Sequence, residues 1–182
     1  MHPYLESNAV SEARQFIPLN IAVLTVSDTR TEADDVSGQV LITGLTQAGH
    51  RLYDKKIVAD NIFRIRAAVS HWIADDEVNA IITTGGTGVT GRDGTPEAVA
   101  PLLEKLLDGF GEMFRMISYQ EIKSSTMQSR AVAGVANATY VFCVPGSSSA
   151  CRTAWESLIK DQLDHRTRPC NLVQLMPRLL ER

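Results

Sequence analysis

The sequence predicts a three-layer α/β fold, an αβα sandwich built around a mostly parallel sheet. Short apolar segments rich in β-branched residues alternate along the chain with segments whose apolar residues recur at helical spacing. This alternation is typical of a parallel-rich sheet with helices on both faces. The length of 182 residues suits one domain with a sizeable core. We therefore expect a polar N-terminal arm over residues 1–18 and a single domain over residues 19–182.

The composition narrows the range of partners. A formal net charge of −3 offers no strong positive field for nucleic acid or anionic lipid. Residues 1–18 lack the apolar core of a signal peptide, and no later run reaches the roughly 20 apolar residues that a membrane span needs. The cysteines form no Cys-x-x-Cys pair, which argues against a disulfide framework and a structural zinc site. We expect a cytoplasmic protein that binds neither nucleic acid nor membrane.

The first strand–helix–strand unit lies near the N-terminus. Residues 20–27 (NIAVLTVS) are short, apolar and β-branched, which predicts a buried strand. Asp35 or Ser37 can then cap a helix that ends near Gly49, since glycine is favoured just beyond a helix C-terminus. Residues 51–58 predict the second strand.

A second helix and a third strand follow. Asp60 stands where a helix N-cap is expected. The apolar residues after it share one helical face, which predicts a stripe that packs on the core: Ile62, Ile65, Val69, Trp72 and Ile73. Residues 80–84 predict a short buried strand that runs directly into a glycine-rich loop.

Two further helices are expected after this loop. Thr95 and Pro96 predict a helix start, with threonine as the N-cap and proline at the first helical position. The apolar face of this helix would consist of Leu102, Leu103, Leu106 and Leu107. Residues 110–122 predict the next helix.

The last third of the chain predicts a turn, a strand and a helix. Residues 131–135 are apolar, residues 137–138 can turn the chain, and residues 139–144 (TYVFCV) predict a buried strand. Ser147 or Ser148 can cap the final helix, whose apolar residues are Trp155, Leu158, Ile159 and Leu163.

The strongest local signal for function is the loop that follows residues 80–84. It opens with Thr84, Gly85, Gly86, Thr87 and Gly88. Glycine lets a ligand approach the backbone closely, and successive exposed amides can form an anion-binding nest. The loop matches neither a Walker motif nor GxGxxG. It indicates a site for a phosphate or a polar heterocycle, whereas the alternative is a tight strand-to-helix turn.

Two aspartates are candidate magnesium ligands. Asp93 lies inside the glycine-rich loop beside Arg92, and hard cations bridge carboxylates and phosphates. It could instead pair with Arg92 or accept hydrogen bonds from loop amides. Asp60 follows the second strand, and its alternative role is the helix cap described above.

A second anion-binding loop is expected after the strand at residues 139–144. Pro145, Gly146, Ser147 and Ser149 lie at the start of a helix, where free amides and the helix dipole favour an anion. The alternative is ordinary helix capping by one serine. Ligands of open α/β sheets bind beyond the carboxyl ends of strands, which is where both loops lie.

The residues after the first strand leave two interpretations open. Asp35, Ser37 and Gly38 could contact a polar ligand, or Asp35 could cap the following helix. Ser27, at the end of the same strand, is also a candidate ligand contact.

These motifs together resemble the MoaB/MogA family of molybdopterin-binding proteins. The resemblance covers roughly residues 17–171 and is carried by the segments NIAVLTVSDTR with Asp35-x-Ser37-Gly38, TTGGTGVTGRDGTPEA, GFGEMFRMISYQEI, STMQSRAVAGVAN, PGSSSACRTAW and LDHRTRPCN. It implies a three-layer α/β fold, binding of molybdopterin, a pterin that carries a dithiolene and a phosphate, and assembly into homotrimers or homohexamers.

The resemblance also implies a reaction. Catalytic members of the family use ATP and magnesium to adenylylate the phosphate of molybdopterin, and two aspartates serve this reaction. By motif match these aspartates are Asp93 and Asp60. The segment PGSSSA lacks the second proline found in established adenylylating members, which have PGxPxS. The sequence therefore leaves two functions open, a Mg-ATP-dependent molybdopterin adenylyltransferase and a non-catalytic molybdopterin carrier or scaffold.

Overall fold

The computed structural model describes residues 14–181, and within them six strands form one mixed sheet in the order β2-β1-β3-β6-β5-β4. The strands are β1 (Asn20–Val26), β2 (Arg51–Val58), β3 (Ala80–Thr84), β4 (Lys105–Leu106), β5 (Val132–Ala136) and β6 (Thr139–Val144). β2, β1, β3 and β6 run parallel, whereas β5 and β4 join antiparallel at one edge. The predicted mostly parallel sheet is confirmed.

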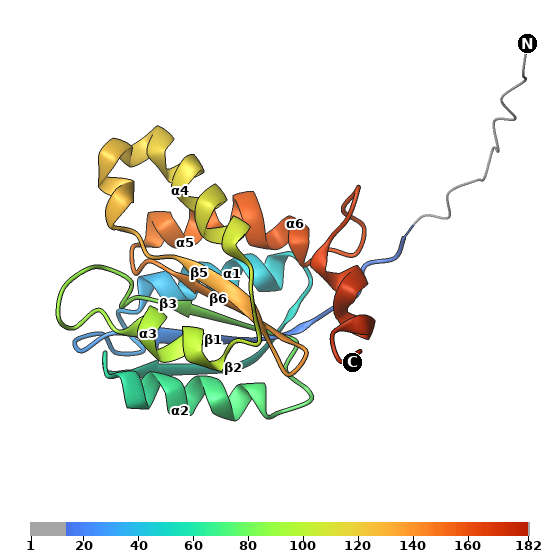
Figure 1. The fold of residues 1–182 in the computed structure, drawn as a ribbon, viewed down its shortest axis with the longest axis horizontal. Coiled ribbons are helices and arrows are strands. Elements are labelled where there is room, and N and C mark those ends of the chain that lie inside the picture. The colour runs from blue at the N-terminus through green and yellow to red at the C-terminus, as the bar shows by residue number, and fades with distance from the viewer. Residues whose placement is uncertain (1–13, 182) are drawn as a thin grey trace, which may run out of the picture.

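Helices cover both faces of this sheet, as Figure 1 shows. They are α1 (Val36–Gln47), α2 (Ile62–Ile73), α3 (Thr95–Val99), α4 (Asp108–Ile122), α5 (Ser148–Ala154) and α6 (Lys160–Gln162). Short 3-10 segments are η1 (Ala100–Leu102), η2 (Lys123–Gln128) and η4 (Leu172–Arg178), and a π-helical turn, η3 (Trp155–Ile159), links α5 to α6. α1, α4, α5 and α6 lie on one face and α2 and α3 on the other, which confirms the three layers.

Strand β1 shows why the sheet is buried on both faces. Ile21 and Val23 pack into the core beneath α1 and α5, while Ala22 and Leu24 pack into the core beneath α2. Because successive side chains of a strand point to opposite faces, a doubly covered strand must be apolar throughout. This is why NIAVLTV has no polar alternation.

The strand register brings three loops to one edge of the sheet. Thr25 in β1 is paired with Thr84 in β3, and Thr84 is in turn paired with Val144 in β6. Since these strands are parallel, their carboxyl ends lie level with one another. The loops that follow them therefore meet at the same place, and these are the loops that the sequence analysis selected.

Most helix starts agree with the sequence, but two caps do not. Asp35 caps α1 by accepting a hydrogen bond from Gly38 N at 2.9 Å. Asn61, not Asp60, caps α2, because its side chain accepts from the amides that begin the helix. Gly94, not Thr95, is the N-cap residue of α3, because the Thr95 hydroxyl donates to Gly85 O at 2.9 Å instead.

The helix expected to carry Leu102, Leu103, Leu106 and Leu107 is wrong. α3 ends at Val99, η1 follows, and Lys105–Leu106 form β4 at the sheet edge. Pro101 has no amide hydrogen to donate to Glu97 O, so the helical ladder cannot continue. Arg66 instead donates to Glu97 O and Ala98 O, at 3.0 and 3.2 Å. The leucines thus belong to a turn and an edge strand.

The ends of the described chain pack together. Phe16 packs against His50 with the two rings tilted and their centroids 5.0 Å apart, and the Arg166 guanidinium lies over the Phe16 ring. Residues 1–13 of the predicted arm lie outside the described residues. Across residues 14–181, no helix has both the length and the apolar character needed to cross a membrane.

Candidate functional site

The loops after β1, β3 and β6 line one cavity of about 470 Å³. This volume is in the range typical of small-molecule sites. The predicted residues that line it are Ser27, Ser37, Thr84, Gly85, Gly86, Thr87, Gly88, Asp93, Pro145, Gly146, Ser147 and Ser149. The fold therefore brings residues from three separate loops to a single site.

Three predicted residues do not line this cavity. Asp35 and Gly38 lie beneath it at the start of α1, and Asp60 lies behind the glycine loop. Asp60 accepts a hydrogen bond from Gly94 N at 3.2 Å, so it links the ends of β2 and of the glycine loop. Asp35, Gly38 and Asp60 therefore contact neighbouring residues of the protein and not the cavity.

The glycine loop needs glycine at its first two positions. Gly85 has φ +100° and Gly86 has φ +62°, both in the left-handed region that favours glycine. A Cβ on Gly85 would lie 2.2 Å from Val26 O, and a Cβ on Gly86 would lie 2.4 Å from Thr95 Oγ1. The close packing of this loop on β1 and α3 thus excludes any side chain there.

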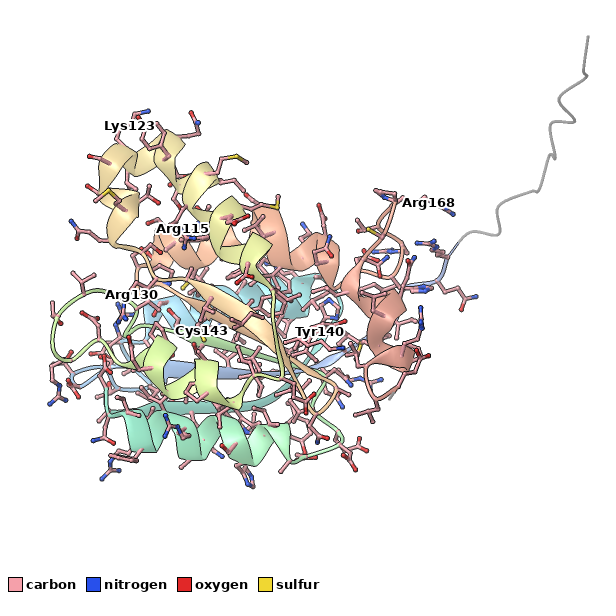
Figure 2. All side chains as sticks on the ribbon, in the orientation of Figure 1. Arg115, Lys123, Arg130, Tyr140, Cys143 and Arg168 are labelled. Atoms are coloured by element: carbon pink, nitrogen blue, oxygen red, sulfur yellow. The ribbon has the colours of Figure 1, made fainter. Side chains whose placement is uncertain are left out.

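Arg130 braces the glycine loop from the far side. Its Nε donates to Gly88 O at 2.7 Å, its Nη2 donates to Asp93 O at 2.6 Å, and its Nη1 binds the Glu97 carboxylate. Figure 2 shows Arg130 at the end of the sheet, beside this loop. Sequence reasoning missed this role, because Arg130 lies more than thirty residues away from the loop and no motif links the two.

Three carboxylates gather around the loop. Asp93 accepts from Thr90 N at 2.8 Å and Thr90 Oγ1 at 2.6 Å, and the hydroxyl bond contributes most to a pKa below the usual value. Burial raises the pKa of Asp60, and the nearby charges of Asp93 and Asp28 raise it further, against the Gly94 amide. Asp28 in turn accepts a hydrogen bond from Asp60 N at 3.1 Å. Arg92 Nη2 pairs with the Asp28 carboxylate at 2.6 Å, so Asp60 and Asp93 are the two carboxylates of this group that a bound cation would neutralise.

Over the described chain, no group of three histidine, cysteine, aspartate or glutamate side chains is arranged to hold a metal ion by itself. Any metal in this position would need ligands from a bound molecule or from water, as is usual for magnesium.

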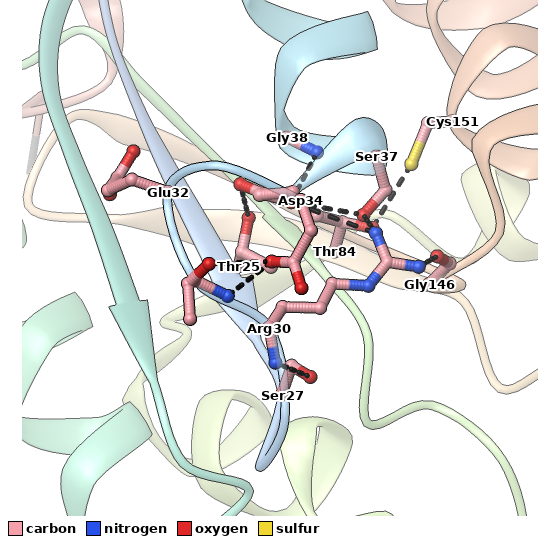
Figure 3. Close-up of polar contacts among 12 residues, drawn as sticks. Thr25, Ser27, Arg30, Glu32, Asp34, Ser37, Gly38, Thr84, Gly146 and Cys151 are labelled. Atoms are coloured by element: carbon pink, nitrogen blue, oxygen red, sulfur yellow. Dashed lines mark hydrogen bonds and ion pairs between the residues drawn. The ribbon is translucent and has the colours of Figure 1, made fainter.

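Arg30 supplies the positive charge of the cavity. Its Nη1 donates to Ser37 Oγ at 2.7 Å and its Nη2 to Gly146 O at 3.4 Å (Figure 3). Arg30 thus joins the start of α1 to the loop at residues 145–149, called the serine loop below. Its side chain is one-third exposed and lines the cavity. Sequence reasoning missed Arg30, although its place four residues after a buried strand was a usable signal.

A buried ion-pair network holds Arg30 and α1 from below. The Asp35 carboxylate accepts from Gly38 N and from Thr25 Oγ1, at 2.9 and 2.8 Å, and pairs with Lys55 Nζ at 3.1 Å. Burial alone would raise the pKa of Asp35, but these partners hold it below its usual value. Arg30 Nη1 lies 3.8 Å from the same carboxylate. Asp35 thus organises the floor of the site.

The serine loop combines both interpretations suggested by the sequence. Ser147 caps α5 by accepting from Ala150 N at 3.2 Å, and it lies 3.3 Å from Ser149 Oγ. Both serines line the cavity. Behind the loop, Cys151 Sγ lies 3.0 Å from Thr84 Oγ1, and burial raises the pKa of the thiol to about 11.

The opposite wall of the cavity comes from α4, η2 and the residue after them. Its lining residues are Phe114, Ser118, Glu121, Ile122, Ser125, Gln128 and Ser129. The sequence analysis assigned no ligand contact to this segment. Its residues meet the loops only because α4 packs over the antiparallel half of the sheet (Figure 1).

Comparison with known proteins agrees with this arrangement. A family profile described as "Probable molybdopterin binding domain" matches residues 22–165. "Molybdenum cofactor biosynthesis protein B" of Escherichia coli K12 is 57% identical over 157 residues, which cover 86% of this chain and 92% of the relative.

Solved structures give the same result. A crystal structure of a molybdenum cofactor biosynthesis protein B superposes with a TM-score of 0.81 at 46% identity and covers 85% of this chain and 96% of its own. The tungsten cofactor synthesizing protein MoaB from Pyrococcus furiosus gives 0.71 at 37% identity, with 78% and 90% covered. This chain therefore belongs to the molybdopterin-binding MoaB/MogA family.

Proposed function

We propose that this protein acts in molybdenum cofactor biosynthesis, where it binds molybdopterin in the cavity and adenylylates the pterin's phosphate with Mg-ATP. One observation carries the proposal. Arg30, the glycine loop and the serine loop converge on one cavity, and Asp93 lies on its lining. The names of the relatives, which refer to molybdenum and tungsten cofactor synthesis, support the pathway.

The cavity is suited to phosphate groups. The N-terminus of α5 presents backbone amides, and so do Gly86 and Thr87 in the glycine loop, whereas the Gly85 amide donates to Val144 O at 3.1 Å. Both segments line the cavity. Arg30 adds a full positive charge beside them, held by Ser37 and Gly146. A pterin phosphate and the phosphates of ATP both need this kind of environment.

The carboxylates fit a magnesium ion. Asp93 and Asp60 repel each other, and their oxygens are the hard donors that magnesium prefers. Two carboxylates together with phosphate oxygens and water are a common magnesium ligand set. When bound, the ion would neutralise charge on the phosphates of ATP. Asp93 and Asp60 are the two residues that would hold it.

The reaction that we propose is an in-line transfer at phosphorus. An oxygen of the pterin phosphate forms a bond to the α-phosphorus of ATP, the bond from that phosphorus to the bridging oxygen breaks, and pyrophosphate leaves. The loop amides and Arg30 stabilise the negative charge that builds up on the phosphoryl oxygens. Arg130 contributes by fixing the carbonyls of Gly88 and Asp93, which sets the direction of the loop.

The second candidate is a carrier that binds molybdopterin without turnover. The specific observation in its favour is the serine loop, where PGSSSA replaces the two-proline pattern of adenylylating members. Its serines here cap α5 and bond each other. Both candidates place molybdopterin in the same cavity, and they differ in what happens when ATP is added.

One experiment separates them. Purified protein is incubated with molybdopterin, ATP and magnesium, and the adenylylated product is followed by chromatography. Asp93→Asn is expected to lower turnover by at least about tenfold, equivalent to about 1.4 kcal/mol of barrier, while molybdopterin binding survives. Asp76→Asn, an exposed aspartate far from the cavity lining, is the control and leaves turnover unchanged. Wild type without any product at saturating ATP and magnesium selects the carrier.

We also propose that the protein assembles as a homotrimer or homohexamer and works in the cytoplasm. Exposed apolar side chains outside the cavity lining cluster on α4 and η2, a pattern typical of subunit contacts: Met113, Met116, Tyr119 and Met127. Light scattering at micromolar concentration measures the mass, and a stable monomer contradicts the proposal. The cysteines, which form no disulfide in the described residues, agree with a reducing compartment.

A further inference from the structure

The two walls of the cavity differ in their chemistry. The wall built from the three loops carries Arg30 and backbone amides, which attract anions. The opposite wall, from α4 and η2, carries the carboxylate of Glu121 together with hydroxyl and amide side chains. A carboxylate repels phosphate, so a ligand with an anionic end must place that end on the Arg30 side. The α4–η2 wall is left for the uncharged end of the ligand.

Glu121 differs from the other carboxylate that lines the cavity. Asp93 is already bonded to Thr90 N and Thr90 Oγ1. Within residues 14–181, the side chain of Glu121 forms neither a hydrogen bond nor an ion pair. Both of its oxygens are thus available to a ligand.

Ser129 gives a second, independent sign of a missing partner. It lines the same wall, and its Oγ is buried yet has no hydrogen-bond partner in the described part of the chain. Buried hydroxyls are normally bonded to protein, water or ligand, and because Ser129 lines the cavity, a ligand there can supply the bond. Nearby, Phe114 and Ile122 give this wall apolar surface against which a flat ring can pack.

The donor pattern of the ligand decides which ring fits. A pterin presents an amino group at position 2 and an N–H at position 3, side by side, and this edge donates two parallel hydrogen bonds to one carboxylate. Adenine presents an amino group beside an unprotonated ring nitrogen, so a carboxylate would gain one bond and face a lone pair. A free carboxylate therefore selects the pterin over the adenine.

We propose that Glu121 selects the pterin ring. The Glu121 carboxylate accepts both hydrogen bonds that the 2-amino-4-oxopyrimidine edge of the pterin donates, and the ring lies against the α4–η2 wall of the cavity. This inference rests on the proposed molybdopterin binding and adds to it an orientation for the ligand. The pterin ring lies against α4 and η2, the phosphate lies beside Arg30, and ATP approaches from the side of Asp93.

The test uses two synthetic probes with the same phosphate arm, 6-hydroxymethylpterin phosphate and 6-hydroxymethyllumazine phosphate. The lumazine has an oxygen in place of the 2-amino group, so it presents an acceptor where the pterin presents a donor. Wild type is expected to bind the pterin at least about tenfold more tightly than the lumazine, as measured by quenching of ligand fluorescence. Glu121→Gln is expected to lose or reverse this preference, because its amide can donate to the lumazine oxygen.

A matched control variant shows whether the effect belongs to Glu121. Glu112→Gln removes a glutamate from the exposed side of the same helix, outside the cavity lining, and is expected to keep the wild-type preference. Glu121 is itself exposed, so its substitution leaves folding intact. An unchanged preference in Glu121→Gln, with tight pterin binding by wild type, overturns this assignment and leaves the proposed function standing.

Two further outcomes also count against the assignment. If Glu121→Gln changes the affinity for ATP and leaves the affinity for the pterin unchanged, the α4–η2 wall holds adenine. If wild type binds neither probe at millimolar concentration, the proposed molybdopterin binding fails together with the inference.

Discussion

The ion-pair network around Asp35 stabilises the folded protein. Asp35→Ala removes the acceptor of the Gly38 amide, which is the N-cap bond of α1 and is worth about 1 kcal/mol. It also removes the partner of Thr25 and of Lys55. Stranding a buried charge costs about 3–5 kcal/mol, but Lys55 keeps a bond to Glu32 at 2.6 Å and is partly exposed. We therefore expect a total loss of roughly 2–3 kcal/mol.

The assay is urea unfolding at neutral pH, followed by the fluorescence of the two buried tryptophans. Asp35→Asn keeps the cap oxygen but presents an amide to Lys55, so we expect it to lose roughly half as much as Asp35→Ala. Lys55→Met, alone and combined with Asp35→Ala, gives the coupling energy of the pair. The reasoning is refuted if Asp35→Ala lies within about 0.5 kcal/mol of wild type, or if the two substitutions are additive.

Three further predictions concern the glycine loop and the pH. Arg130→Met removes the bonds to Gly88 and to the loop beyond it, so hydrogen exchange of residues 85–93 should speed up by at least about tenfold, while Arg130→Lys should retain part of the protection. Gly85→Ala places a Cβ 2.2 Å from Val26 O and should lower the free energy of unfolding by more than about 2 kcal/mol, whereas a thermal midpoint equal to that of wild type would contradict the packing. The pKa of Asp35 is lowered in the folded protein, so the ionised carboxylate stabilises the fold above its ordinary pKa of 3.8, and this stabilisation is lost as the pH falls through the folded-state pKa. The difference in unfolding free energy between wild type and Asp35→Ala should therefore shrink below pH 3.8. Urea midpoints measured across this pH range test the prediction.

The sequence predicted correctly those features that depend only on residues close together in the chain. The run NIAVLTV is apolar without alternation because helices cover both faces of β1, and this pattern can be recognised without a structure. Asp35 and Ser147 cap helices through bonds to amides three residues away. Such short-range bonds leave a signal in the order of the residues. The strands β1, β2, β3 and β6 and the glycine and serine loops that follow two of them were predicted for the same reason.

The sequence was misleading where a distant partner competes for a side chain. Thr95 has the right residue type for a helix cap, but the glycine loop takes its hydroxyl through a bond to Gly85 O. Asp60 likewise lies next to the true cap, Asn61, and turns instead to Gly94. Such outcomes depend on how β2, β3 and the loop pack together, which the residue order does not reveal.

Residues that reach the site from far along the chain could not be assigned to it in advance. Arg130 follows an unremarkable hydroxyl-rich stretch, and Glu121 is one of several glutamates on an amphipathic helix. Each acquires its meaning only when the antiparallel strands β5 and β6 turn the chain back and set α4 beside the parallel strands. Long-range topology therefore supplies the α4–η2 wall of the cavity.

The thiol behind the serine loop has a consequence for the chemistry of the ligand. Molybdopterin carries two sulfur atoms of its own, and a thiolate beside them could exchange with them or oxidise to a mixed disulfide. Cys151 is fully buried against Thr84, and with a pKa of about 11 it stays protonated at neutral pH. A protonated thiol is a poor nucleophile. A cysteine directly behind the serine loop is therefore compatible with the binding of molybdopterin that we propose, because its protonated thiol does not react with the sulfur atoms of that ligand.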